Sequence, residues 1–241
     1  MKFKTSITQI KDDKEIIRGK TLESLVKKQS FVATIFLLLF GRLPKKNEEV
    51  VFNALLVSAI DHGPGTTSAL NARISASAGN PVHASLAAGI LGFGERHGMA
   101  VEGAMKFFYE NEGEKDLRLI ITDLKERKVR LPGFGHKVFT KVDPRSVTLF
   151  TIAKKQKIFG KYCMFAGVVH KELNAVSSKP LPLNIDGAIA AILCDMKVPV
   201  ELGNTIFLMG RIPGLLAHIY EERTNDVGIR RLEEGEIEHI F

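Results

Sequence analysis

Three histidines in this 241-residue chain lie where the local pattern breaks a helix, rather than on helical faces. His62 stands in a turn rich in glycine and proline, and His97 and His136 each adjoin a glycine. Histidine can polarise or protonate an oxygen, a carboxylate can move a carbon-bound proton, and arginine binds carboxylates through paired hydrogen bonds. On these grounds we collect His62, His97, His136, Asp186, Arg145, Arg211 and either Arg230 or Arg231. The side-chain types at these positions favour acid–base chemistry on a small polyanionic molecule.

The segment Leu131-Pro-Gly-Phe-Gly-His-Lys-Val-Phe-Thr-Lys-Val-Asp-Pro-Arg145 joins an irregular backbone to a helix start. Gly133 and Gly135 can adopt backbone conformations that are closed to other residues. Asp143 is a suitable N-cap, and Pro144 suits the first helical position. Cations beside a helix N-terminus bind carboxylates or phosphates, and the cations here are Lys137, Lys141 and Arg145. A basic surface turn without a function is the alternative for this segment taken alone.

Asp186 follows an extended approach over residues 177–183 and stands in Asn184-Ile-Asp-Gly187, before an apolar run to about Met196. One interpretation makes it the N-cap of that helix, which would stabilise the fold by about 1 kcal/mol. The other makes it a carboxylate placed to move a proton. The sequence pattern leaves both interpretations open.

Composition narrows the class of partner. The formal charge of +7 favours anionic partners. With no Trp and three Tyr, the chain offers few platforms for stacking nucleic-acid bases, although its 15 Phe could supply some. No close pair of ligands predicts a metal site, so none is expected. Cys163 and Cys194 lie in apolar stretches typical of a core, and so small a number of cysteines suits a reducing cytosol.

The elements that must position these residues are helices, and we predict an all-α protein. Residues 31–40 form an apolar helix between Ser30 and Gly41, too short to span a membrane and predicted to be buried. A second helix is expected over residues 47–60, and a long apolar one over 203–222 with an interruption at 210–214. Residues 66–103 are rich in small side chains, which predicts close helix packing. Residues 1–20 are expected to form short strands or a loose arm.

Several of these motifs, in this order, resemble the citrate synthase superfamily. They are Arg18-Gly-Lys-Thr-Leu-Glu-Ser-Leu with Phe36-Leu-Leu-Leu-Phe-Gly-Arg-Leu-Pro44, Asp61-His62, His97-Gly98, Gly133-Phe-Gly-His136 with Asp143-Pro-Arg145, Asn184-Ile-Asp-Gly187, and Gly210-Arg211. The resemblance runs from about residue 15 to the C-terminal tail. It implies a citrate synthase-like fold with a large helical domain (1–98 and 196–241) and a small one (99–195) that closes over the active site.

Two features are more similar to citryl-CoA lyases and to the C-terminal module of ATP-citrate lyase. The chain is shorter than ordinary citrate synthases, and its turn continues as Asp61-His-Gly-Pro, where synthases have Asp-His-Glu. His97 matches a histidine that the lyase module usually lacks, and it favours the synthase instead. The expected reaction is therefore cleavage of citryl-CoA to acetyl-CoA and oxaloacetate. A small citrate synthase, or a relative using another 2-oxo acid, is the alternative. The second alternative is a catalytically silent CoA-binding subunit of a larger assembly.

The resemblance also implies a role for each residue. His136 would take the proton of the citryl hydroxyl, His97 would hold the enolate oxygen, and Asp186 would protonate carbon. The carboxylates would be bound by His62, Arg145, Arg211 and Arg231, the last from a neighbouring subunit of a homodimer or homotetramer. CoA is expected as a substrate along Gly133, Phe134, Gly135, Lys137 and Lys141, with no permanently bound cofactor. A cytoplasmic protein without nucleic-acid or membrane partners is expected.

Overall fold

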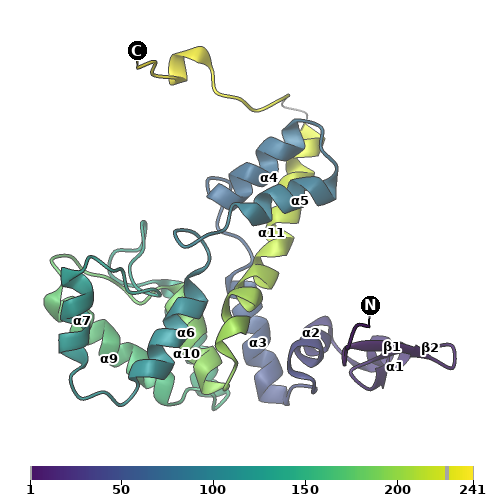
Figure 1. The fold of residues 1–241 in the computed structure, drawn as a ribbon, viewed down its shortest axis with the longest axis horizontal. Coiled ribbons are helices and arrows are strands. Elements are labelled where there is room, and N and C mark those ends of the chain that lie inside the picture. The colour runs from purple at the N-terminus through teal and green to yellow at the C-terminus, as the bar shows by residue number, and fades with distance from the viewer. Residues whose placement is uncertain (1, 226–227, 241) are drawn as a thin grey trace.

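A computed structural model describes residues 2–225 and 228–240 of the chain. The N-terminal unit begins with three short antiparallel strands in the order β1 (Thr8–Lys11), β2 (Lys14–Ile17) and β3 (Lys20–Thr21). This small sheet projects from one side of the molecule (Figure 1). The prediction of an all-α chain is confirmed for the rest of the fold, and the sheet falls where short strands were expected.

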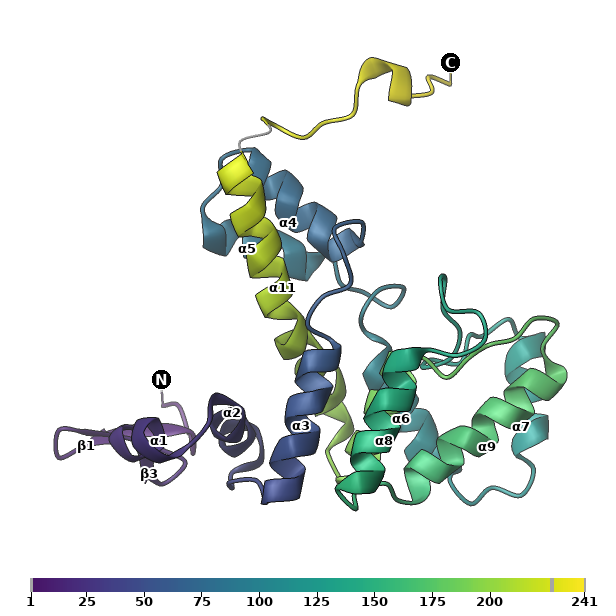
Figure 2. The same cartoon turned by 180° about the vertical axis from the view of Figure 1, so that it is seen from behind.

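Helix α1 (Leu22–Lys28) follows the sheet, and α2 (Phe31–Phe40) follows α1. The limits predicted for α2 are confirmed, because the Ser30 hydroxyl caps its first turn and Gly41 ends it. The prediction that α2 is buried is wrong. Only Ala33, Phe36 and Leu37 are buried, and Phe31 is 81% exposed. The helix lies towards the N-terminal edge of the molecule, with α3 covering one face only (Figure 2).

The main lobe comprises α6 (Ala100–Asn111), α7 (Leu117–Glu126), α8 (Pro144–Lys155), α9 (Lys161–Val176) and α10 (Ile185–Asp195). Helices α6, α8 and α9 pack on α10, and α7 packs on α9. From Gly187 to Cys194, every residue of α10 is buried. This is the pattern expected of a central helix that is apolar on all sides. Helix α3 (Lys46–Ser58) packs on α8 and connects the lobe to the N-terminal unit.

A second group of helices, α4 (Thr67–Ser77), α5 (Val82–Leu91) and the C-terminal half of α11 (Gly203–Asn225), rises from the lobe as an arm (Figure 1). The close packing predicted for residues 66–103 is confirmed here. A Cβ placed on Gly89 of α5 would lie 3.0 Å from the Ala72 Cβ of α4. Small side chains therefore let α4 and α5 approach closely.

Helix α11 runs without a break from the lobe to the end of the arm, so the predicted interruption at residues 210–214 is wrong. Pro213 lacks a backbone donor, yet the helix continues through it. The glycines on either side serve packing instead. A Cβ on Gly214 would lie 2.2 Å from the Ile60 carbonyl oxygen, and one on Gly210 would lie 2.8 Å from that of Leu56. Tertiary contact with the end of α3 holds this part of α11 in place.

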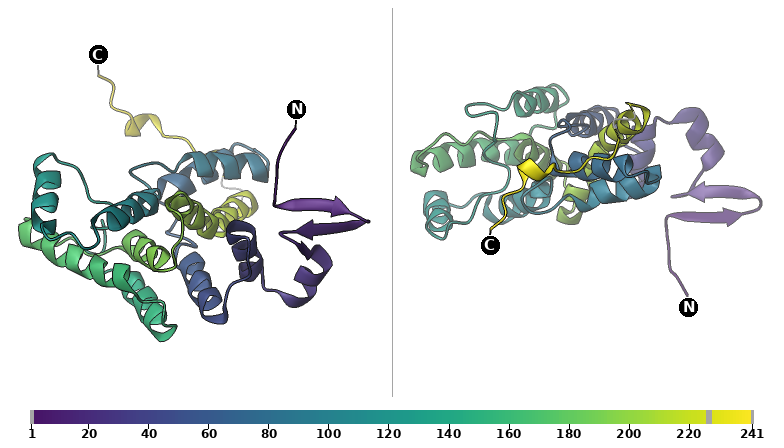
Figure 3. Two further views of the ribbon diagram at one scale, coloured as in Figure 1. Left: turned by 60° about the horizontal axis from the view of Figure 1, so that its bottom comes forward. Right: turned by 90° about the horizontal axis from the view of Figure 1, so that it is seen from above.

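Two short 3-10 helices, Val200–Leu202 and Glu234–Glu236, complete the described secondary structure. The tail that holds the second one leads away from the tip of the arm (Figure 3). Within the described residues, no helix is both long and apolar enough to cross a membrane. His62, in the segment between α3 and α4, and His136, in the loop before α8, both meet Arg145 at the start of α8.

Candidate active site

The loop over residues 131–145 is attached to the start of α10 by hydrogen bonds on both sides of Phe134. The Gly133 carbonyl accepts from the Asn184 amide at 3.0 Å, and the Gly135 amide donates to the Pro182 carbonyl at 2.8 Å. Gly133 has a φ of +86°, and a Cβ there would lie 2.7 Å from the Gly187 Cα. Only glycine permits this close approach. The loop that presents His136 is thereby placed against the helix that presents Asp186.

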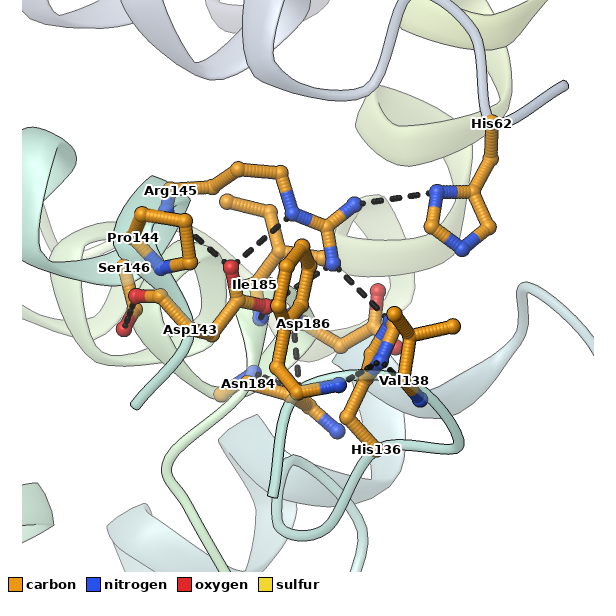
Figure 4. Close-up of polar contacts among 12 residues, drawn as sticks. His62, His136, Val138, Asp143, Pro144, Arg145, Ser146, Asn184, Ile185 and Asp186 are labelled. Carbon is orange, nitrogen blue, oxygen red and sulfur yellow. Dashed lines mark hydrogen bonds and ion pairs between the residues drawn. The ribbon is translucent and has the colours of Figure 1, made fainter. Parts of the chain in front are cut away.

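Arg145 lies at the centre of a cluster of predicted site residues (Figure 4). Its Nη1 lies 3.3 Å from His62 Nδ1, and its Nη2 lies 3.2 Å from His136 Nε2. The two imidazole rings stand edge to face, with centroids 5.4 Å apart. The structure thus brings together three predicted residues that are separated by up to 83 positions in the chain.

Asp143 holds Arg145 in this position. Its carboxylate is fully buried and accepts from Arg145 Nε at 3.0 Å and from Nη2 at 2.8 Å. It also accepts the Arg145 backbone amide, which confirms the predicted N-cap, and the Ile185 amide of α10 at 3.1 Å. Burial opposes ionisation, but the hydrogen bonds and charge of Arg145 outweigh it and lower the pKa of Asp143. Sequence reasoning recognised Asp143 only as a cap.

Asp186 has the opposite environment. The N-cap of α10 is Asn184, whose side-chain oxygen accepts from the amides of Asp186 and Gly187, so Asp186 is not the cap. The Asp186 Oδ1 atom is buried and has no hydrogen-bond partner among the described residues. Burial raises the pKa of this carboxyl to about 6, although the charges of Arg145 and Arg211 act against the shift. A carboxyl with a pKa near neutrality can both accept and deliver a proton.

His97 lies in a tight turn between α5 and α6, where its amide and carbonyl pair with those of Gly94. Its ring stacks on Phe93 at 5.1 Å, and its Nε2 lies 2.9 Å from the hydroxyl of Ser68. Ser68 is fully buried on α4 and was missed by sequence reasoning, since a serine in a run of small residues carries no pattern of its own. If Ser68 donates to Nε2, the Nδ1 of His97 carries the proton and can donate to a ligand.

Arg211 is 4% exposed and lies on α11 near the end of α3. Its Nε donates to the Ala59 carbonyl at 2.5 Å, and its guanidinium lies over the Phe207 ring. Among the described residues it makes no ion pair with a carboxylate. A buried arginine with spare donors is suited to bind a ligand carboxylate.

The three histidines are held neutral. Burial lowers the pKa of His62, His97 and His136, and nearby cations lower it further. The cation with the largest effect is Arg145 for His62 and His136, and Arg211 for His97. The Nδ1 of His136 accepts from two backbone amides, those of Val138 and Phe139. Arg145 Nη2, which can only donate, lies at the other ring nitrogen, Nε2. A neutral imidazole accepts at one nitrogen only, so each tautomer satisfies the donors on one side of the ring.

The residues predicted to line the CoA have two kinds of environment. Phe134 packs its ring edge-on against Phe108 in the core, 6.4 Å between centroids, so it anchors the loop. Lys137 and Lys141 are exposed at the loop surface, and neither forms an ion pair within the described residues. Both ammonium groups are thus available to an anionic ligand. Gly133 and Gly135 present backbone and contribute no side chain.

Arg230 and Arg231 lie outside the cluster, on the C-terminal tail. Arg230 is engaged by the buried carboxylate of Glu222, with Nε to Oε1 at 2.5 Å and Nη2 to Oε2 at 3.0 Å. Arg231 is exposed, and no ion pair of its side chain is seen within the described part of the chain. The structure does not bring either arginine to Arg145. Of the two, Arg231 is the one with a guanidinium available to a ligand.

The fold and this arrangement of neutral histidines, cations and a protonatable carboxyl define a helical protein built for acid–base chemistry. The family model of the citrate synthase C-terminal domain matches residues 44–232, and the chain belongs to the citrate synthase family. The predicted resemblance and fold class are therefore confirmed.

Among solved structures, the chain is similar to a citryl-CoA lyase from Hydrogenobacter thermophilus. The two share 41% identity and superpose with a TM-score of 0.93, over 99% of this chain and 94% of that one. Citrate synthase 2 of Bacillus subtilis is 30% identical over 88% of this chain and 58% of its own length. A probable ATP-citrate synthase of Dictyostelium discoideum is 26% identical over 98% of this chain. The chain spans 41% of that relative, less than half its length.

Proposed function

We propose that this protein is a citryl-CoA lyase, which cleaves citryl-CoA into acetyl-CoA and oxaloacetate. The observation that carries the proposal is the buried Asp186 carboxyl, which lacks a protein partner on Oδ1 and lies within the field of Arg145 and Arg211. The higher identity to the Hydrogenobacter thermophilus lyase, 41% against 30% for the Bacillus subtilis synthase, supports the lyase over the synthase.

In the proposed cleavage, the tertiary hydroxyl of the citryl group loses its proton to His136, and its oxygen becomes the carbonyl of oxaloacetate. The bond between the hydroxyl-bearing carbon and the methylene next to the thioester breaks, and its electron pair forms the enolate of acetyl-CoA. Asp186 then delivers a proton to the enolate carbon. Proton acceptance at His136 Nε2 requires the tautomer with the proton on Nδ1, so substrate binding must displace the backbone donors from Nδ1.

His97 is proposed to stabilise the enolate. With Ser68 donating to Nε2, Nδ1 is the donor of His97, and this neutral imidazole can hydrogen-bond the developing negative oxygen. The stacked Phe93 ring limits rotation of the imidazole. Donors fixed in advance stabilise a transition state without reorganisation during the reaction.

The carboxylates of the oxaloacetate half are proposed to bind His62, Arg145 and Arg211, with Arg231 supplied by a neighbouring copy of the chain. This last contribution can be tested by mixing two inactive variants, Arg231→Ala and Asp186→Ala, after dissociation and reassembly. If Arg231 acts across a subunit interface, mixed oligomers recover activity that neither parent shows. No recovery would mean that Arg231 serves its own subunit or none.

CoA is proposed to lie along the loop over residues 133–137, with its phosphates near Lys137 and Lys141. We further propose that residues 99–195 close as a unit over this position, since Arg145 and His136 of this unit meet His62, which lies outside it. Closure would exclude water from the enolate and complete the set of donors.

The reaction is tested by a product assay on synthetic citryl-CoA. Oxaloacetate is coupled to malate dehydrogenase, and free thiol is followed in parallel. Oxaloacetate without a rise in free thiol is the expected result. Citrate with free CoA would mean that the enzyme hydrolyses the thioester and is a synthase, and neither product with CoA still bound would mean a silent CoA-binding subunit.

A further inference from the structure

Behind the Asp61–His62 turn lies a row of polar side chains from α4 and α11 to which the proposed reaction assigns no role. His218 of α11 donates from Nε2 to Asp61 Oδ1 at 3.0 Å. Arg73 of α4 places Nη1 3.4 Å from the other ring nitrogen, His218 Nδ1. Asp61 Oδ2 accepts the Gly63 amide at 3.0 Å. The side chain of His218 is 14% exposed, so it is largely shielded from solvent.

The direction of each hydrogen bond in this row is determined by Arg73. A guanidinium can only donate, so His218 Nδ1 accepts and Nε2 keeps the proton that it gives to Asp61. Arg73 is itself held by two carboxylates, with Nε on Glu222 and Nη1 on Glu221, each at 2.7 Å. The Glu222 side chain is fully buried. His218 is therefore held in one tautomer and one orientation.

The turn that His218 holds has little support from its own backbone. Within the described structure, residues 61–65 make no backbone-to-backbone hydrogen bond. Their support comes from the side chain of Asp61, from the Thr66 hydroxyl, which donates to the Gly63 carbonyl at 3.3 Å, and from α11, where Gly214 leaves no room for a Cβ against Ile60. The next residue, His62, contacts Arg145 and stands edge to face with His136. A shift of Asp61 would thus be transmitted directly to His62.

We propose that His218, oriented by Arg73, is a positioning residue that fixes the Asp61–His62 turn so that His62 meets a ligand carboxylate beside Arg145. The identity of that ligand as the oxaloacetate half of the substrate rests on the proposed function. The positioning of His62 by His218 does not rest on the proposed function, since it acts in the ligand-free protein. His218 acts through Asp61 and makes no contact with the substrate.

Two substitutions of His218 distinguish loss of the hydrogen bond to Asp61 from loss of the imidazole ring itself. Glutamine can place its amide nitrogen where imidazole Nε2 lies and donate to Asp61, whereas asparagine reaches only the position of Nδ1. We expect His218→Gln to keep the wild-type affinity for oxaloacetate, measured by calorimetry on the full chain. We expect His218→Asn to weaken it about tenfold, with a comparable rise in the KM for citryl-CoA and a smaller change in kcat. The same pair of changes at His170, a half-buried histidine of α9, should affect neither quantity.

A second readout needs no substrate. The imidazole nitrogens of His62, assigned by loss of signal in His62→Gln, report its tautomer by nitrogen NMR. We expect His218→Asn to shift these signals and His218→Gln to leave them in place. Unchanged His62 signals in His218→Asn, or equal effects of both substitutions, would overturn the proposal. Failure of the wild-type protein to cleave citryl-CoA would instead overturn the proposed function and leave the NMR result to decide the role of His218.

Discussion

Two carboxylates at the starts of two helices make the most instructive comparison in this molecule. Asp143 begins α8 and Asp186 lies in the first turn of α10, and both are within reach of Arg145. Asp143 accepts two backbone amides and the guanidinium of Arg145, and its pKa is lowered. Asp186 Oδ1 has no donor among the described residues, and burial raises its pKa to about 6.

The difference teaches that burial alone does not decide the protonation state of a carboxyl. Both groups are removed from water, which disfavours charge in each. The number of donors aimed at the oxygens determines the outcome. At the start of α10 the side chain of Asn184 accepts the two free amides, so the helix is capped without the carboxyl of Asp186. Asp143 is thereby a structural carboxylate, and Asp186 is left available for chemistry.

The largest expected effect is the loss of turnover in Asp186→Asn. An amide of the same shape cannot exchange a proton with carbon, so we expect kcat to fall about 10²–10⁴-fold. Calorimetry should show that oxaloacetate still binds, which would separate lost chemistry from lost binding. Near-normal turnover in this variant would show that the proposed mechanism is wrong.

The next largest effect is expected at Asp143. Replacing Asp143 with asparagine keeps a cap but removes the charge that holds Arg145, which should destabilise the protein by about 2–4 kcal/mol at pH 7. Because its folded pKa is lowered, this stabilisation is present above pH 4 and is lost as pH falls through the folded value. Chemical denaturation at a series of pH values should show that the free energy of unfolding of the variant depends less on pH in the acid range. Asp123→Asn, at an exposed ion pair with Arg127, is the matched control and should change stability by under about 0.5 kcal/mol.

Asp186 should affect stability with the opposite sign. Its folded pKa of about 6 lies above the ordinary value of 3.8, so the folded state keeps a proton that the unfolded chain has released. Stability should therefore fall as pH rises from about 4 to 6, and the loss should persist at pH 7. We expect Asp186→Asn to be about 1–3 kcal/mol more stable than wild type at pH 7 and equal to it near pH 4. A variant less stable than wild type at pH 7 would show that Asp186 has a partner in the folded protein.

The smallest effect concerns Asn184, which caps α10 in place of Asp186. Asn184→Ala should lose about 1 kcal/mol of stability, as expected for an N-cap. It should also lower activity, since the Asn184 amide donates to the Gly135 carbonyl at 2.8 Å and holds the His136 loop against α10. Ser30→Ala removes the cap of α2 and should lose similar stability without a change in kcat. Equal activity in both variants would show that the Asn184 link has no part in positioning His136.

Local features were the ones that could be predicted from the sequence. The start of α8 at Asp143 and Pro144, and the limits of α2 between Ser30 and Gly41, follow from capping preferences of neighbouring residues. The order of the motifs was sufficient to predict the family, which the comparison confirms. A capping rule acts within one turn, so it needs no knowledge of the rest of the fold.

What only the tertiary structure decided were the relations between distant segments. Ser68 behind His97, the continuity of α11 through Pro213 and the exposure of Phe31 depend on which elements meet. The isolation of Asp186 depends on α10 lying in the core. The sequence determined which residues could carry chemistry. Packing decided which of them are desolvated and which have partners, because burial and pairing are properties of surroundings that no local pattern encodes.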